Sequence, residues 1–550
     1  MSPLALLLSA AAVANAPADL IIRDAHIVTV DKNFSTANAA AIRDGRFIAV
    51  GSDADVMRTA GPRTRVIDLH GTTVLPGFND THVHLTAGKD LETEVDLTNI
   101  HSIKQIQAAI AARAKELKPG DWIVGTRGWW EYQLAEGRLP TRVDLDAAAP
   151  DNPVSIPGPH YVIVNSLALK LAGVTRATPD PQGGQIYKDA NGEPTGLLMD
   201  NAGRFVRHFM PKTTEAQEIA GMKRVLALVN SHGLTSAGDP SGSPEDAAMF
   251  RKLRDHGDLT VRVDFAYNID PAEPLDKVDS ELKALPKPGS DGDGMFRSDE
   301  IGETGLDGAE LTALLEHDYP GKPGYRGLQK VPTEQFKQFA VLVAKYGYRL
   351  RPHAVGDAAI DEALDAFEYA NSQTPIVKRR WMIDHAFLLG PQHYERVKRL
   401  GLIINSQYMH NYQLGALILK AWKQPLADRS EPYAEWLKNG VMFAGGSDGP
   451  ISYHAEPLLE IYGEVTRGTA WGGKLGPDQG ISRADAIRSV TINGAYTTFE
   501  EGVKGSIEPG KYADFVVLSD DILKVPAETI RDLKVLTTVL GGRAVYGKLH

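Results

Sequence analysis

The feature that most constrains the fold is an alternation of helix-like and strand-like segments between about residues 100 and 450. Apolar residues recur at the helical period near residues 102–117, 215–233, 333–347 and 359–373. Short apolar runs follow such segments, and each meets a polar residue and then a loop: "LTSAGD", "YRLRPHAVGD", "WMIDHAFL", "GLIINSQY" and "VMFAGGSDGP". Repeated β–α units predict an α/β fold, a (β/α)8 TIM barrel. A doubly wound sheet is the runner-up, but no G-x-G-x-x-G follows a predicted strand.

Both ends of the chain have a sequence pattern different from that of the middle. Residues 19–74 contain short runs of Ile, Val and Thr separated by Asp-Gly or His-Gly turns, and residues 505–547 repeat this pattern. Because chain termini often lie close together, we expect the two ends to form one small β-sandwich domain. The predicted domains are a first β-sandwich part over 17–75, the barrel over 76–498 and a second β-sandwich part over 499–550.

Charge and cysteine content limit the possible functions. A formal net charge of −11 without a dense Lys/Arg run argues against a nucleic-acid partner. Without cysteine, a metal must be held by histidines and carboxylates, or by a modified lysine. We expect a small-molecule substrate and no membrane span in the mature protein, and the sequence leaves a homodimer open.

The first sixteen residues, "MSPLALLLSAAAVANA", are typical of a signal peptide. The apolar run is too short to span a membrane and ends in small residues suited to cleavage. No Lys or Arg precedes it, and Pro17 would follow the cut. The segment predicts export to a bacterial periplasm, with the cytoplasm as the alternative.

Two histidines, one residue apart, stand in "THVHL". In an extended segment His82 and His84 project from the same face, which suits a shared metal ion because histidine is the commonest zinc ligand. Taken alone, such a pair is more often an ordinary surface or core feature, so the other strand ends decide its meaning.

Chemically active side chains recur at the C-terminal ends of the predicted strands, where TIM barrels place their active sites. After His82 and His84 come five further residues: Asp239, Glu303, His353, His385 and Asp448. Imidazoles and carboxylates could hold zinc, manganese, iron or nickel with positions open for water. Asp239 is the exception, because a role in orienting its neighbours suits it better.

The order of several motifs resembles the amidohydrolase superfamily, and within it the amidohydrolase-3 (YtcJ-like) branch. The matching pieces are "PGFNDTHVH", "HYVIVNSLAL", "HAVGDAAIDEALDAFE", "IDHAFLL", "GGSDGP", "TINGAY" and "GSIEPGKYADFVVL". The resemblance implies a metal-dependent hydrolase with a (β/α)8 barrel and a β-sandwich built from both chain ends. It also implies that His82 and His84 bind one divalent metal, that His353 and His385 bind the other, and that Asp448 is ligand and general base.

One departure from the branch concerns the bridge between the two metals, which we expect to be zinc. The branch usually has "KxFADG", whose carboxylated lysine joins the ions, whereas this chain reads "ETGLDG" and places Glu303 at that position. A glutamate carboxylate is a shorter analogue of a lysine carbamate and needs no carbon dioxide. Glu300 is a second candidate, and a lost bridge with a single metal is the alternative.

The predicted reaction is hydrolysis of a carbon–nitrogen bond in an amide, cyclic amide, N-formyl or N-acyl substrate. A metal would lower the pKa of bound water, and Asp448 would carry the proton to the leaving group. Hydrolysis of an ester or carbamate is an alternative. A mononuclear deaminase is another, but "HAVGD" at 353–357 lacks the glutamate of the deaminase His-Ala-x-Glu segment. An inactive binding or regulatory relative is the third.

Substrate contacts are predicted from two loop segments. "GTRGWWEYQL" places Arg127, Trp129 and Trp130 after a strand, and "GPHYVIVNSLAL" contains His160 and Asn165. His160 would line the pocket beside an aromatic wall, although core packing explains the tryptophans equally well. Arg127 could pair with a substrate carboxylate or with a local Asp or Glu. Tyr408 and His410, after "IINSQ", are weaker candidates.

Overall fold

The computed structural model describes residues 16–549, except residues 92, 98–99, 128, 130, 159–160, 182–183, 211 and 451–454. The predicted signal peptide lies outside the described residues apart from Ala16, and export stays a prediction. Within the described chain, no helix has the length and apolar character that crossing a membrane requires. The chain divides into two compact units. The first comprises residues up to 83, 226–448 and 455–550, and the second comprises 84–225 and 449–454.

The first unit contains the predicted barrel, with eight parallel strands adjacent in chain order. These are β8 (Phe78–Asp80), β14 (Leu234–Gly242), β15 (Arg262–Tyr267), β16 (Phe296–Gly305), β17 (Arg349–Ala354), β18 (Met382–His385), β19 (Ile403–Ser406) and β20 (Phe443–Gly445). The Thr81 N–H donates to the carbonyl of Gly445 (3.2 Å), which brings the end of β20 beside the segment that follows β8. The (β/α)8 prediction is confirmed.

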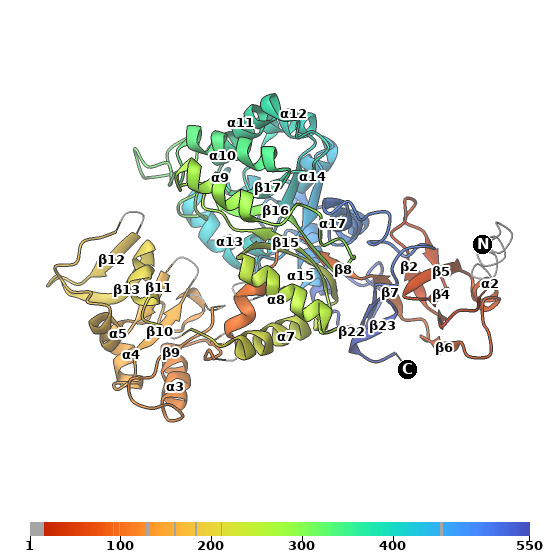
Figure 1. Cartoon of the computed structure of the whole chain (residues 1–550), viewed down its shortest axis with the longest axis horizontal. Helices are drawn as coiled ribbons and strands as arrows, with labels where there is room; N and C mark the ends of the chain where they lie inside the picture. The colour runs from red at the N-terminus through yellow and green to blue at the C-terminus, as the bar shows by residue number, and fades with distance from the viewer. Residues whose placement is uncertain are drawn as a thin grey trace. The chain divides into compact units, whose positions relative to one another are not determined.

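Helices cover the outside of these strands (Figure 1). They are α8 (Pro244–Asp255), α9 (Leu275–Ala284), α10 (Thr333–Tyr346), α11 (Asp357–Gln373), α12 (Pro391–Leu400), α13 (Tyr408–Trp422), α14 (Tyr433–Lys438), α15 (Pro457–Thr466), α16 (Arg483–Ser489) and α17 (Ile492–Thr497). Local sequence sets their ends: Ser243 and Asp246 form a capping box on α8, and α10 ends at Gly347 with a left-handed φ of 85°.

The small β domain, also in the first unit, pairs the two ends of the chain (Figure 1). One sheet orders β5 (Arg46–Gly51), β4 (Ala39–Arg43), β1 (Leu20–Arg23) and β6 (Arg65–Asp68), and α2 (Asp53–Met57) follows β5 in the chain. The other orders β23 (Arg543–Gly547), β22 (Val535–Leu540), β21 (Phe515–Leu518), β7 (Thr73–Pro76), β2 (His26–Val28) and β3 (Thr36–Ala37). Ile22, Ile27, Val74 and Phe515 share one buried core. The β domain predicted from the two chain ends is confirmed.

The barrel interior is charged rather than purely aliphatic. Arg349 Nη2 lies 3.1 Å from Asp264 Oδ2, and Arg351 lies 3.1 Å from Glu300 Oε2 and 2.9 Å from Asp384 Oδ1. All five side chains are buried. Because a buried charge is tolerated only when it is paired, removing one partner of such a network costs about 3–5 kcal/mol. The network therefore fixes the strands that carry the site.

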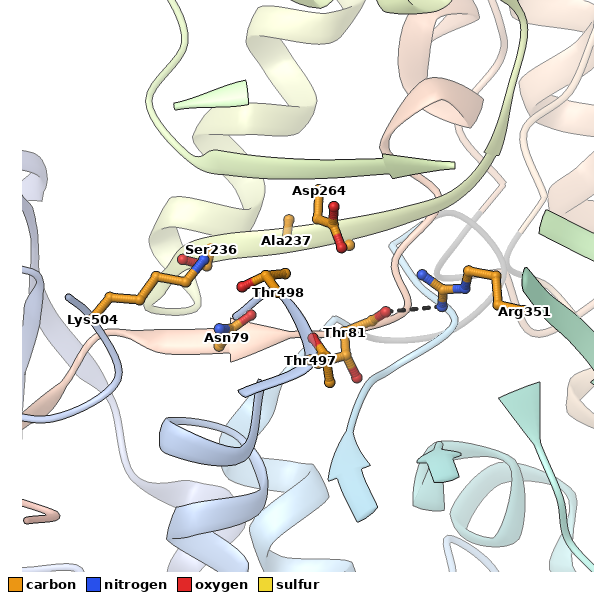
Figure 2. Close-up of a pocket in the computed structure, with 10 residues that line it drawn as sticks. Asn79, Thr81, Ser236, Ala237, Asp264, Arg351, Thr497, Thr498 and Lys504 are labelled. Atoms are coloured by element: carbon orange, nitrogen blue, oxygen red, sulfur yellow. Dashed lines mark hydrogen bonds between the residues drawn. The ribbon is translucent and has the colours of Figure 1, made fainter. Parts of the chain in front are cut away.

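A small cavity adjoins this network inside the barrel. Asn79, Asp264, Thr497, Thr498 and Lys504 are among its lining residues, and Figure 2 shows their side chains converging from separate segments. Its volume of about 10 Å³ has room for one water molecule. Burial raises the pKa of Asp264 above its ordinary range, and the neighbouring Glu300 adds to this effect.

The second unit has its own five-stranded sheet and core. The strand order is β12 (Gly184–Lys188), β13 (Pro194–Asp200), β11 (Tyr161–Val164), β10 (Val154–Pro157) and β9 (Ile123–Val124). Its helices are α3 (Ile103–Ala114), α4 (Arg142–Ala148), α5 (Ser166–Leu171) and α6 (Arg204–Arg207), and the boundary between the units falls within α7 (Glu215–Ser231). Ile106, Leu145 and Ile156 belong to one of its hydrophobic clusters.

Candidate metal centre

Glu303, on β16, stands among three histidines that lie at or just after the C-terminal ends of barrel strands. Nδ1 of His353 (on β17) and Nε2 of His385 (on β18) lie 2.7 and 2.9 Å from Oε1 of Glu303. The other oxygen, Oε2, lies 3.7 Å from Nε2 of His82. The carboxylate therefore has one oxygen toward the His353–His385 pair and the other toward His82.

Asp448 follows β20 and completes this group. Its Oδ1 lies 3.6 Å from Nε2 of His82, and its Oδ2 lies 2.9 Å from Nε2 of His410. Asp448 and His385 both have left-handed backbones, with φ of 56° and 70°. Such conformations cost a non-glycine residue about 1 kcal/mol or more and gather at functional sites.

Burial and mutual contacts set the charges of the group. Burial alone would raise the pKa of Glu303, but hydrogen bonds from His353 and His385 hold it well below its usual range. Burial and the nearby His385 lower the pKa of His353 to about 4. Burial would lower the pKa of His82, yet the carboxylates of Asp384, Asp448 and Glu303 outweigh it and raise the pKa to about 10.

The orientation of His82 depends on a carboxylate that the sequence analysis did not single out. Nδ1 of His82 lies 3.5 Å from Oδ1 of Asp384, on the side of the ring away from Glu303 and Asp448. Asp384 accepts hydrogen bonds from Arg351 (2.9 Å) and from Asn405 Nδ2 (2.7 Å). A carboxylate behind a ligating imidazole fixes its tautomer and direction. The acidic residue directly before His385 in "IDH" was the available signal.

The two candidate bridging glutamates have different surroundings. Glu300 is fully buried in ion pairs with Arg349 (2.6 Å) and Arg351 (3.1 Å), whereas Glu303 contacts the histidines. Asp307, from the same "ETGLDG" segment, accepts backbone N–H bonds from Gly356 (2.8 Å) and Val355 (3.0 Å). The structure thus brings Glu303 to the candidate site and gives Glu300 a place in the interior network.

Two further residues of the strand-end set are His84 and Asp239. His84 belongs to the second unit, where it precedes the short 3-10 helix η1 (Leu85–Asp90) and donates its backbone N–H to Gly449 (2.7 Å). Asp239 is fully buried on β14.

The donor set suits a divalent metal. Ligand atoms of His82, Glu303 and His385 lie within 4.8 Å of one another, as do those of His385, His410 and Asp448. Nε2 of His353 and Nδ1 of His385 are buried with no hydrogen-bond partner among the described residues. Buried polar atoms are rarely left in this state unless an ion, water or ligand satisfies them. Imidazole nitrogens and carboxylates are the usual ligands of zinc and similar ions.

The residues predicted to contact substrate lie in the second unit, except that Trp130 and His160 are outside the described residues. Trp129 is fully buried and packs edge-on against Tyr161 (6.0 Å between ring centroids). Asn165 caps α5, because its Oδ1 accepts the Ala168 N–H (3.0 Å), and its Nδ2 donates to Asn152 (2.8 Å). These contacts stabilise the unit itself.

The weaker candidates Tyr408 and His410 differ in the structure. Tyr408 is fully buried, and its hydroxyl donates to the carbonyl of Gly468 (3.2 Å). His410 contacts Asp448 directly. Burial would lower the pKa of His410, but hydrogen bonds with Asp448 and Glu310 raise it to about 9.

Arg127, predicted to contact substrate or a local carboxylate, acts electrostatically on Glu94 in the second unit. Its Nη1 donates to the carbonyl of Gly158 (3.2 Å). Burial, reinforced by Asp90, raises the pKa of Glu94 to about 7, while the charge of Arg127 partly opposes this shift.

Replacing Glu94 with Gln is expected to stabilise the second unit at higher pH only. A folded-state pKa above the ordinary value of 4.5 contributes stability below that pH, and the contribution is lost as pH rises toward 7. The variant's advantage should therefore grow between pH 4.5 and 8, by at most about 3 kcal/mol. Thermal unfolding of both proteins across this range measures it, and a constant difference would contradict the raised pKa.

The chain is similar to known proteins along most of its length. A family model described as the amidohydrolase family matches residues 65–546. The YtcJ protein of Bacillus subtilis is 30% identical, over 95% of this chain and 98% of its own length. An N-substituted formamide deformylase of Arthrobacter pascens is 28% identical, over 96% of this chain and 98% of its own. The fold is similar to that of an uncharacterized metal-dependent hydrolase from Pyrococcus horikoshii, with a TM-score of 0.74, 24% identity and coverage of 92% and 99%.

Proposed function

Because this chain belongs to the amidohydrolase family, we propose that it is a metal-dependent hydrolase of carbon–nitrogen bonds. The substrate classes are amides, cyclic amides, and N-formyl or N-acyl compounds. Similarity to an N-substituted formamide deformylase along nearly the whole chain makes N-formyl compounds the first class to test.

The observation that carries the proposal is the position of Glu303. Its two oxygens face different histidines, at 2.7 Å (His353), 2.9 Å (His385) and 3.7 Å (His82). A carboxylate that offers one oxygen to each of two ligand groups is suited to joining two ions. We propose that His82 and His84 hold one zinc, that His353 and His385 hold the other, and that Glu303 bridges them with Asp448 as a further ligand.

The remaining roles in the reaction are assigned to the chain's own residues. A bound divalent ion would lower the pKa of its water and polarise the scissile carbonyl. Asp448 accepts the proton of the attacking water and delivers it to the leaving nitrogen. Asp384 holds the ring of His82 in place from behind. Substrate contacts by Arg127, Trp129, His160 and Asn165 stay predictions.

A substrate panel with metal analysis tests the proposal. Protein of measured metal content is incubated with N-substituted formamides, N-acyl amines, lactams, esters, carbamates and aminated heterocycles, and the released carboxylate, amine and ammonia are quantified. We expect about two metal equivalents per chain and turnover of at least one carbon–nitrogen class. Ester or carbamate cleavage alone, or ammonia released only from aminated heterocycles, would contradict the carbon–nitrogen hydrolase. Absence of any turnover in the metal-loaded protein would favour the inactive relative.

A further inference from the structure

His410 connects the proposed proton carrier to a second buried carboxylate. It occupies the first turn of α13, where Nε2 lies 2.9 Å from Oδ2 of Asp448 and Nδ1 lies 3.4 Å from Oε1 of Glu310. Glu310 follows β16 in the chain, so the three residues join segments that follow three different barrel strands. His410 is 5% exposed and Glu310 is 3% exposed. The imidazole is therefore a buried link between two carboxylates.

Packing leaves this ring little freedom to turn. Phe387 meets it edge-on at 5.2 Å between centroids, and the ring of His385 lies 5.3 Å away. With both nitrogens facing carboxylate oxygens, rotation of the ring would break two charge-assisted hydrogen bonds at once. Such bonds in a buried site are about twice as strong as neutral ones.

The contact with His410 fixes the direction of the Asp448 carboxylate. Oδ2 is engaged by His410, whereas Oδ1 is the oxygen on the side of His82, at 3.6 Å. A carboxylate held at one oxygen cannot rotate freely about its Cβ–Cγ bond, so the second oxygen keeps a fixed direction. Asp448 also has a left-handed backbone (φ 56°). Its carboxylate therefore needs a contact that holds it in one orientation.

We propose that His410, backed by Glu310, is a positioning residue that fixes the carboxylate of Asp448 with Oδ1 toward His82 and the reacting water. The inference rests on the proposed hydrolase function, because it assigns a partner to the general base of that reaction. In this assignment His410 touches neither substrate nor metal and acts through Asp448.

The test compares His410→Leu, which removes the hydrogen bond, with His410→Gln, whose amide can donate from nearly the position of Nε2. Glu310→Gln removes the charge behind the ring. His393→Leu is the matched control, since His393 is also a buried histidine in the first turn of a barrel helix, α12. Each protein is measured for metal equivalents at saturation, zinc affinity by chelator competition, kcat, KM and thermal stability.

We expect His410→Leu to keep all metal equivalents at saturation but to lose about tenfold or more in zinc affinity, as outer contacts of metal sites do. Its kcat should fall about 100-fold with KM changed less than about threefold, because orientation of the base matters in the transition state. His410→Gln should recover most of both losses, Glu310→Gln should show a smaller loss, and His393→Leu should change stability alone.

Two results would overturn the assignment. Wild-type kcat and zinc affinity in His410→Leu would show that Asp448 needs no such anchor. Loss of a whole metal equivalent at saturation would make His410 a ligand instead. Failure of the proposed function is distinguishable, because it would leave the wild-type protein without turnover, whereas the zinc-affinity comparison would still report on His410.

Discussion

Replacement of Asp448 by Asn is expected to abolish hydrolysis while the protein remains folded and retains most of its metal. Asparagine has nearly the same size and can still accept the hydrogen bond from His410 at 2.9 Å through its amide oxygen. It cannot accept the proton of the attacking water. Because general acid–base catalysis contributes about 10²–10⁴-fold, we expect kcat to fall by about 10³-fold or more.

The comparison requires kcat, KM, metal content and the melting temperature of both proteins. Asp255→Asn, a change at an exposed residue on α8, controls for purification and charge. A variant that kept more than about a tenth of the wild-type kcat at full metal occupancy would remove Asp448 from proton transfer. A large loss of metal together with activity would instead make it chiefly a ligand.

The barrel and its site-bearing strand ends could be predicted because each is encoded locally. "WMIDHAFL" contains an apolar run, an active side chain and a turn within eight residues, and β18 ends at His385 as that pattern indicates. Pairing of the two chain ends was predicted from their similar patterns of short strands and turns alone. In the structure β7 pairs with β21. Gly347 marked the end of α10 for the expected stereochemical reason, a left-handed φ.

The charged interior could not be predicted in the same way. "YRLRPHAV" alternates polar and apolar residues as a half-exposed strand does, yet Arg349 and Arg351 are buried. Their partners, Asp264 and Asp384, come from positions 85 and 33 residues away in the chain. No local pattern shows that these charges cancel. The acidic residue before His385 was a local signal, but the role of Asp384 depends on contacts with His82 and Arg351 from distant parts of the chain and was missed.

The second unit was not distinguished in the sequence, because its strands resemble those of the barrel. Its strands, such as "YVIV" in β11, have the same apolar character as barrel strands, and no composition shift separates residues 84–225 from their neighbours. β11 pairs antiparallel with both β10 and β13, a relation that only the fold reveals. His410 was similarly weak in sequence, because its significance depends on Asp448 and Glu310, which follow other strands.

Substitution at Glu303 is the other change with a large expected effect, because it removes the carboxylate on which the binuclear arrangement depends. Glu303→Ala leaves His353 and His385 without the oxygen that lies 2.7 and 2.9 Å from them. We expect it to lose at least one metal equivalent and to fall about 10³-fold or more in kcat, since a two-metal site loses both its bridge and its charge balance. Glu303→Gln keeps the shape without the charge and should lose metal as well.

Glu300→Gln is the matched control for this change. Glu300 lies in the same segment and is buried, but its contacts are Arg349 (2.6 Å) and Arg351 (3.1 Å). Its replacement leaves two buried guanidinium groups short of a partner, so the melting temperature should fall while the metal equivalents at saturation stay constant. If Glu300→Gln lost metal and Glu303→Ala did not, the assignments of the two glutamates would have to be exchanged.

The most discriminating variant is Glu303→Lys, which restores the residue that the similar branch usually has at this position. A lysine can act as a bridging oxygen donor only after carboxylation, so its metal content should depend on added bicarbonate. The wild-type protein carries its carboxylate already, and hydrogen bonds from His353 and His385 hold the pKa of Glu303 well below its usual range. Its metal content should therefore be the same in bicarbonate-free and bicarbonate-rich buffer. Bicarbonate dependence in the wild type, or two metals in Glu303→Ala, would show that another group forms the bridge.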